Sequence, residues 1–374
     1  MNIISYSAAM LFFLIMETAR AIRIKKPSIT LILFPAFFVL SLLWKSTGFL
    51  TGGILILIMA SDRLVKGGIA LAGKFGVSPF FIGIFIIGLG TSSPELFVNL
   101  LSALRGDTAL AMGNILGSNI SNMGIVIGAA GLIAGTMKLE ASLIKKEIPI
   151  MLAASILLLL LVLDFPPFSN EADSSNMVLT LQDGLLLFLC LIMYLLYTIN
   201  SMNKPDSKPE LRASAIPDAP TLPIEPHSAV DSTFNILTGI AGLYFGGEFI
   251  ISSSVSIAEA LGAGTMTLGI IVGLGTSLPE LATGINCALK NETDLVVGNV
   301  LGSNIFNILL ILGLTSIIRP VFLTPDVLVH FGFLIGISII FFISLGSERK
   351  LNRIEAALLL AAGLGYLGFS IVTG

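Results

Sequence analysis

The chain has 374 residues, of which 55% are hydrophobic and only 11% charged, with a net charge of −3 and a mean hydropathy of +0.98. Soluble domains carry about 25% charged residues, so this composition excludes soluble enzymes and nucleic-acid-binding proteins. The two cysteines and two histidines are too few for a disulfide scaffold or a histidine-based metal site.

Twelve apolar stretches, separated by charges and turn residues, predict an all-α polytopic membrane protein. The run 184–203 has no charged residue and is long enough to cross a hydrocarbon core about 30 Å thick. In chain order the predicted helices cover residues 3–22, 28–46, 48–72, 79–104, 108–136, 147–163, 180–200, 233–259, 267–289, 293–318, 324–344 and 352–373.

The distribution of lysine and arginine predicts how these helices are oriented. With the N-terminus placed outside, the cytoplasmic loops hold fifteen of these residues and the outer loops only three. Positive residues concentrate in the cytoplasmic loops of membrane proteins. We therefore expect both termini on the extracytoplasmic side, and the proline-rich, charged segment 201–232 to be a flexible cytoplasmic linker.

A segment of 41 residues occurs twice in the chain. Residues 88–128 and 273–313 align without a gap at an offset of 185, and 21 positions are identical. The two copies begin on helices five spans apart, so they are expected to cross the membrane in opposite directions. Secondary transporters use such inverted repeats to build one midplane site from two halves. Because polar positions are repeated along with small and apolar ones, transport explains the repeat better than packing alone.

Glu95 and Glu280 occupy equivalent positions near the middle of their predicted spans. An ionised carboxylate at that depth is costly unless it is paired, and neither helix supplies a nearby lysine or arginine. A bound cation is the natural partner. The alternative is a protonated glutamate satisfied by a neighbouring hydroxyl.

A proline precedes each of these glutamates. Pro94 and Pro279 lack a backbone donor, which predicts a helix break and unpaired carbonyls at Gly90 and Gly275. Such carbonyls are tolerated at membrane depth only where they line a cavity or meet an ion. Hydroxyl side chains surround each predicted break, at Thr91, Ser92, Thr276 and Ser277.

The second part of each copy reads GNILGSNISN (113–122) and GNVLGSNIFN (298–307). Its glycines are four residues apart, which lets two helix backbones approach closely. The serine and asparagine four residues apart share a helix face, and we expect their oxygens to point toward the broken helix: Ser118, Asn122, Ser303 and Asn307. The other asparagines are expected to cap or bridge helices: Asn114, Asn119, Asn299 and Asn304.

All of these candidate ligands are oxygen donors, which favours Na⁺, Ca²⁺ or Mg²⁺ over zinc, copper or iron. Two carboxylates neutralise one divalent or two monovalent ions, so the site can exchange Na⁺ for Ca²⁺ at nearly constant charge. Mg²⁺ usually keeps its waters, so a dense protein cage favours Ca²⁺. Elsewhere, Asp62 has Arg63 and Lys66 nearby, which predicts an ion pair, while the role of Glu248 stays open.

The paired motifs GTSSPE…GNILGSNISN and GTSLPE…GNVLGSNIFN resemble the two alpha-repeats of the sodium/calcium exchanger family, within the cation/calcium antiporter superfamily. The resemblance covers about residues 48–374 and implies ten core helices in two inverted five-helix halves, 47–200 and 233–374. Residues 1–46 would form an additional N-terminal transmembrane hairpin. The short linker implies a prokaryote-like transporter in the plasma (inner) membrane.

The resemblance also implies the ion ligands, position by position in the motifs. They are the side chains of Glu95, Glu280, Thr91, Ser92, Thr276, Ser277, Ser118 and Ser303 and the carbonyls of Gly88 and Gly273, with Asn122 and Asn307 close by. Several branches of the family, including the potassium-dependent exchangers, carry an aspartate where this chain has Asn307, which argues against K⁺ co-transport.

We therefore expect an antiporter, not an enzyme, that needs no cofactor and exchanges Na⁺ for Ca²⁺ across a lipid bilayer by alternating access. A Ca²⁺/H⁺ antiporter that uses the same glutamates is the main alternative. A cation channel fits an inverted repeat less well, and an intramembrane hydrolase would need a nucleophile with its base or a metal motif. The sequence fixes neither the oligomeric state nor the stoichiometry.

Overall fold

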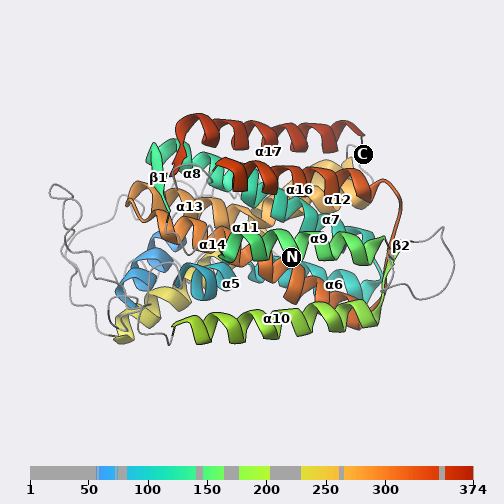
Figure 1. Cartoon of the computed structure of the whole chain (residues 1–374), viewed down its shortest axis with the longest axis horizontal. Coiled ribbons are helices and arrows are strands. Elements are labelled where there is room, and N and C mark those ends of the chain that lie inside the picture. The colour runs from blue at the N-terminus through green and yellow to red at the C-terminus, as the bar shows by residue number, and fades with distance from the viewer. Residues whose placement is uncertain are drawn as a thin grey trace, which may run out of the picture.

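The computed structural model shows a bundle of helices that lie roughly along one direction (Figure 1). It describes residues 56, 59–71, 74, 82–139, 146–163, 177–202, 229–260, 265–344 and 350–373. The predicted helices 3–22 and 28–46 lie outside the described residues, and 48–72 is described mainly from residue 59 onward. The nine later predicted helices all coincide with described helical segments.

Each copy of the repeat folds as a broken helix followed by a long one. The first copy contains η1 (Gly83–Gly88), α5 (Leu89–Thr91), α6 (Ser93–Arg105), α7 (Thr108–Ser121), η2 (Asn122–Val126) and α8 (Ile127–Ala134). The second contains α12 (Thr265–Thr276), α13 (Leu278–Leu289), α14 (Thr293–Phe306), η5 (Asn307–Leu312) and α15 (Gly313–Ile318). The remaining helices are α9 (Ile148–Val162), α10 (Leu181–Met202), α11 (Ala229–Ala260), α16 (Val327–Ser344) and α17 (Arg353–Thr373).

Both predicted helix breaks are present, two residues before the prolines. α5 ends at Thr91 and α12 ends at Thr276, Ser92 (ψ 7°) and Ser277 (ψ −1°) interrupt the helices, and the first break bends the chain by 49°. Pro94 and Pro279 then lie in the first turn of α6 and α13. A proline is tolerated there because a first-turn N–H has no helical partner. Each proline therefore starts a new helix.

Five described helices are long and apolar enough to cross a membrane, and the bent pair η1–α6 makes a sixth within the described residues. Two of them are the continuous segments Thr108–Ala134 and Thr293–Ile318, most of whose residues are buried. Each passes through a π-helical turn, and these turns begin at Asn122 and Asn307, which are 185 residues apart. The central long helices of both copies thus share the same irregularity.

Two short ribbons, which the sequence did not predict, join distant parts of the chain. Strand β1 (Thr136–Lys138) pairs antiparallel with β4 (Lys350–Asn352), and β2 (Met177–Leu179) pairs antiparallel with β3 (Val321–Leu323). The ribbons lie at opposite ends of the bundle (Figure 1). Each connects the segment after one repeat copy to a segment of the other half.

Glycines bring each broken helix against the long helix of the other copy. A methyl group added at Gly273 of α12 would collide with the Asn114 carbonyl oxygen of α7 and lie 2.9 Å from the Ser118 nitrogen. At Gly88, the equivalent contacts would be 3.2 Å to the Asn299 carbonyl oxygen and 3.3 Å to the Ser303 nitrogen. At Gly273 a side chain would collide with the backbone of α7, and at Gly88 it would be a tight contact with α14, so the helix backbones of the two copies lie close together.

Asp62 forms the ion pair that the sequence predicted with Lys66, at 2.6 Å, and a second one with Lys290, at 2.7 Å. Lys290 follows α13, 228 residues further along the chain. The neighbouring Asn286 side chain also donates a hydrogen bond to the Ser61 hydroxyl. Polar contacts therefore fasten the helical segment 59–71 to the end of α13.

We expect Gly128→Ala to destabilise the protein. The added methyl group would lie 2.6 Å from the Leu360 nitrogen of α17, and overpacking of this kind costs about 1–3 kcal/mol. Gly336→Ala on α16 is the matched control, because no described atom lies within 4 Å of the added methyl group. Thermal unfolding in detergent should show a lower Tm for the first variant only. Equal values would contradict the close packing of α8 on α17.

We also expect Asp62→Asn to destabilise the protein more than Lys290→Met. The first change leaves two ammonium groups without their carboxylate, and the Lys290 side chain is only 18% exposed. The second leaves Asp62 still paired with Lys66. A partly exposed pair contributes up to about 1 kcal/mol, so the difference in Tm should be small but measurable. Wild-type Tm values in both variants would show that the pair between Asp62 and Lys290 does not hold these helices together.

Candidate ion-binding site

All twelve candidate ligands are buried where the broken helices meet the long ones. Their side chains or backbone atoms come from η1, α5, α6, α7 and η2 of the first copy and from α12, α13, α14 and η5 of the second. Glu95 and Glu280 are 0% exposed. The other ten buried residues are Gly88, Thr91, Ser92, Ser118, Asn122, Gly273, Thr276, Ser277, Ser303 and Asn307.

Each glutamate receives a hydrogen bond from the serine of its own copy. The Ser118 hydroxyl donates to Glu95 Oε1 at 3.3 Å, and the Ser303 hydroxyl donates to Glu280 Oε1 at 3.2 Å. Ser92 of the first copy also donates to Glu280 Oε1, at 3.3 Å, so the two copies meet at this carboxylate. The second oxygen of each glutamate, Oε2, has no donor among the described residues.

The carbonyl oxygens of Gly88 and Gly273 collect several donors. Gly273 O accepts the Ser277 N–H at 3.1 Å and lies within 3.1 Å of the hydroxyls of Ser118, Thr276 and Ser277. Gly88 O is placed equivalently. It accepts the Ser92 N–H at 3.0 Å and lies 3.2 Å from the hydroxyls of Thr91 and Ser303. Among the described side chains the hydroxyls thus gather here, not at Gly90 and Gly275, where the prolines predicted unpaired carbonyls.

Four asparagines form a network between the two long helices. Asn122 Nδ2 donates to Asn304 Oδ1 at 3.0 Å, and Asn307 Nδ2 donates to Asn119 Oδ1 at 2.9 Å. Asn304 Nδ2 donates in turn to the Asn119 carbonyl at 3.2 Å. Asn119 and Asn304 therefore bridge helices, as predicted, while the Oδ1 atoms of Asn122 and Asn307 have no donor among the described residues.

Asn99 is a further polar residue of the site region, and the sequence analysis missed it. It lies one turn after Glu95 on α6, is completely buried, and donates from Nδ2 to the Glu95 carbonyl at 2.9 Å. Its Oδ1 has no donor among the described residues. The second copy has Gly284 at the equivalent position, so a search for positions identical in both copies passes over it.

The acceptor oxygens that lack a donor indicate which ligand the site can bind. Two carboxylate oxygens (of Glu95 and Glu280) and three amide oxygens (of Asn99, Asn122 and Asn307), all buried, lack a donor among the described residues. Buried acceptors without a partner are costly, and a cation satisfies them without supplying a proton. Among the described residues no group of three or more His, Cys, Asp or Glu side chains is close enough to hold a metal ion. Hydroxyl, amide and carbonyl oxygens must therefore complete any coordination shell, which favours Na⁺ and Ca²⁺.

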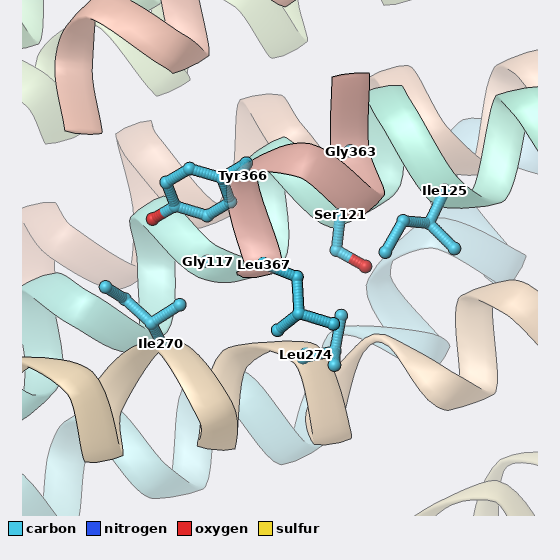
Figure 2. Close-up of a pocket in the computed structure, with 8 residues that line it drawn as sticks. All are labelled: Gly117, Ser121, Ile125, Ile270, Leu274, Gly363, Tyr366 and Leu367. Carbon is cyan, nitrogen blue, oxygen red and sulfur yellow. The ribbon is translucent and has the colours of Figure 1, made fainter. Parts of the chain in front are cut away.

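A small pocket lies beside the site but contains none of the candidate ligands. Its walls come from α7, η2, α12 and α17, as Figure 2 shows. The lining is mostly apolar: Gly117, Ser121, Ile125, Ile270, Leu274, Gly363, Tyr366 and Leu367. Gly117 and Leu274 directly adjoin Ser118 and Gly273 in the chain. The pocket wall therefore includes the chain neighbours of two candidate ligands but none of the ligands themselves.

A helical bundle with an oxygen-lined, buried centre is the class of fold that ion transporters use. The chain matches the sodium/calcium exchanger protein family over residues 45–200 and 232–372, and it belongs to this family. The family consists of multi-pass membrane transporters, not enzymes, and its activity is cation/calcium antiport.

Individual relatives agree with this assignment. The chain is 33% identical to CaxA of Alkalimonas amylolytica over 330 residues, which cover 86% of this chain and 97% of CaxA. It is 29% identical to the sodium/calcium exchanger MaX1 of Methanosarcina acetivorans over 350 residues, 86% of this chain and 96% of MaX1. The structure resembles that of the sodium-calcium exchanger NCX_Mj with a TM-score of 0.68 and 25% identity, covering 87% of this chain and 98% of NCX_Mj.

Ser118→Ala and Ser303→Ala should weaken Ca²⁺ binding to a similar extent. Each removes a hydroxyl that contacts one glutamate and one glycine carbonyl of the opposite copy. A hydrogen bond contributes about 1 kcal/mol, so we expect about a fivefold increase in Kd, measured by calorimetry. Ser338→Ala is the control, because that buried hydroxyl donates only to the Leu334 carbonyl of its own helix. A large effect of one site variant alone would show that the copies contribute unequally.

Proposed function

We propose that this protein is an alternating-access antiporter that exchanges Na⁺ for Ca²⁺ across the plasma (inner) membrane, at a midplane site built from Glu95 and Glu280. One observation carries the proposal. Two fully buried carboxylates at equivalent positions each keep one oxygen bonded to a serine and one oxygen without a donor among the described residues. Such a pair needs positive charge, and no lysine or arginine lies near either glutamate on its repeat helix.

The proposed architecture has ten core helices in two inverted halves, residues 47–200 and 233–374. The linker 201–232 would be cytoplasmic and the hairpin 1–46 would lie outside the core. Equivalent contacts at an offset of 185 residues support this arrangement: Ser118 reaches Gly273 O, and Ser303 reaches Gly88 O. The positive-inside distribution supports extracytoplasmic termini.

The same site explains coupling between the two ions. With neither ion bound, two bare carboxylates would remain in a low-dielectric interior, which is unfavourable. Interconversion of the inward- and outward-open forms is therefore restricted to the occupied protein, and exchange is favoured over leak. Asn307 adds no charge, because its amide is neutral and donates to Asn119, so two negative charges remain to be balanced. One Ca²⁺ or two Na⁺ ions balance them.

The remaining ligands are proposed from the same geometry. The Ser92 hydroxyl donates to Glu280, and the hydroxyls of Thr91, Thr276 and Ser277 donate to the carbonyls of Gly88 and Gly273. Asn122 and Asn307 are buried one helical turn after Ser118 and Ser303. The relatives MaX1 and NCX_Mj are named sodium/calcium exchangers, which supports Na⁺ as the coupling ion.

Uptake of ⁴⁵Ca²⁺ into proteoliposomes tests the coupling ion. We expect uptake into vesicles loaded with Na⁺ and none into vesicles loaded with choline, because an outward Na⁺ gradient drives Ca²⁺ inward. Uptake that ignores Na⁺ and follows an imposed pH gradient would instead establish the Ca²⁺/H⁺ antiporter.

Glu95→Gln and Glu280→Gln should each abolish Ca²⁺ transport while the protein stays folded. Glutamine keeps an acceptor for the serine hydroxyl but removes the charge that binds the cation. Interactions with a charged group contribute about 1.5–3 kcal/mol, so we expect Ca²⁺ affinity to fall about a hundredfold. Glu355→Gln should transport normally, because this half-buried carboxylate in the first turn of α17 accepts from the Asn352 N–H and is not a candidate ligand. Near-normal flux in both site variants would refute the proposed site.

A further inference from the structure

When a cation is bound, the hydrogen atoms of the site hydroxyls need acceptor atoms that do not themselves bind the cation. Gly88 O lies 3.2 Å from the hydroxyls of both Thr91 and Ser303. Gly273 O lies 3.1 Å from the Thr276 hydroxyl and 3.0 Å from that of Ser118. A cation that binds either carbonyl occupies lone pairs to which these hydroxyls now point. Each hydroxyl hydrogen must then turn to another acceptor, or it will face the cation.

The serines have such an acceptor in the glutamates, and the threonines have one in two asparagines. Thr91 Oγ1 lies 3.0 Å from Asn299 Oδ1, and Thr276 Oγ1 lies 3.2 Å from Asn114 Oδ1. Both asparagines are 0% exposed, and each is on the long helix of the opposite copy. The two pairs are equivalent at the 185-residue offset.

We propose that Asn114 and Asn299 are positioning residues of the ion site, and that each takes up the hydroxyl hydrogen of the threonine on the opposite copy. The threonine oxygen then keeps both lone pairs for the cation. The adjacent glycine carbonyl no longer accepts the threonine hydrogen and can also bind the cation. The inference rests on the proposed function, because it requires Thr91 and Thr276 to be ligands.

The way these amides are used distinguishes them from bridging asparagines. Asn304 uses both ends of its amide: Nδ2 donates to the Asn119 carbonyl, and Oδ1 accepts from Asn122. Asn114 and Asn299 use only Oδ1, and their Nδ2 groups have no acceptor among the described residues. An amide that only joined two helices would be expected to pair its donor as well, because a buried unpaired N–H is costly. The acceptor oxygen is the part of these side chains that the site uses.

A double-mutant cycle on the full-length protein tests the role of Asn299. The variants are Thr91→Val, which removes the hydroxyl at constant shape, Asn299→Ala and the double variant, with Ca²⁺ affinity measured by calorimetry in detergent. We expect Asn299→Ala to weaken Ca²⁺ binding about fivefold when Thr91 is present and by less than twofold when Thr91 is valine. Asn299→Asp keeps the acceptor oxygen, so Thr91→Val should reduce Ca²⁺ affinity by the same factor in the Asn299→Asp protein as in the wild type.

Two comparisons keep the outcome decisive. The Asn304 side chain hydrogen-bonds to neither threonine. The fold-changes in Ca²⁺ affinity of Asn304→Ala and Thr91→Val should therefore simply multiply in the double variant. The equivalent cycle with Thr276→Val and Asn114→Ala repeats the test if an Asn299 variant does not fold. Equal costs of Asn299→Ala in both backgrounds would overturn the positioning role and leave the proposed antiporter site intact. Unchanged Ca²⁺ affinity in Thr91→Val, Glu95→Gln and Glu280→Gln alike would overturn the site and the positioning role together.

Discussion

Two carboxylates buried in an apolar bundle require polar groups around them, and the centre of the structure is arranged to supply these groups. Glu95 and Glu280 are fully enclosed, and burying a charged group without compensation is one of the most costly things a fold can do. The nearby helix breaks at Ser92 and Ser277 place backbone and hydroxyl groups beside these side chains. Serines from the neighbouring long helices donate to one oxygen of each. The polar centre therefore consists of many weak dipoles around two strong charges.

Neither copy of the repeat can complete this centre alone. The Ser118 hydroxyl reaches a carbonyl of the second copy, and Ser92 reaches a carboxylate of the second copy. These contacts need closely packed backbones, and glycine at 88 and 273 permits this packing, most strictly at Gly273.

Much of this could be predicted from the sequence, because the responsible signals are local or repeated. Long apolar runs located the helices, prolines located the breaks, and identity between the copies marked the polar residues that meet. Three features lay beyond such reasoning. The strands of β1–β4 and β2–β3 are three residues long, too short to show an alternating pattern. Lys290 reaches Asp62 across 228 residues, and Asn99 has no counterpart in the second copy.

The two ribbons also have a mechanical consequence. Backbone pairing has a fixed register, with Met137 opposite Leu351 and Val178 opposite Phe322, so the paired segments cannot slide without breaking their hydrogen bonds. The ribbons lie at opposite ends of the bundle (Figure 1), so one holds the end of α8 beside the start of α17 and the other holds the start of α10 beside the end of α15. The segment 59–71 is fastened to α13 by side-chain contacts, which break and re-form at much lower cost.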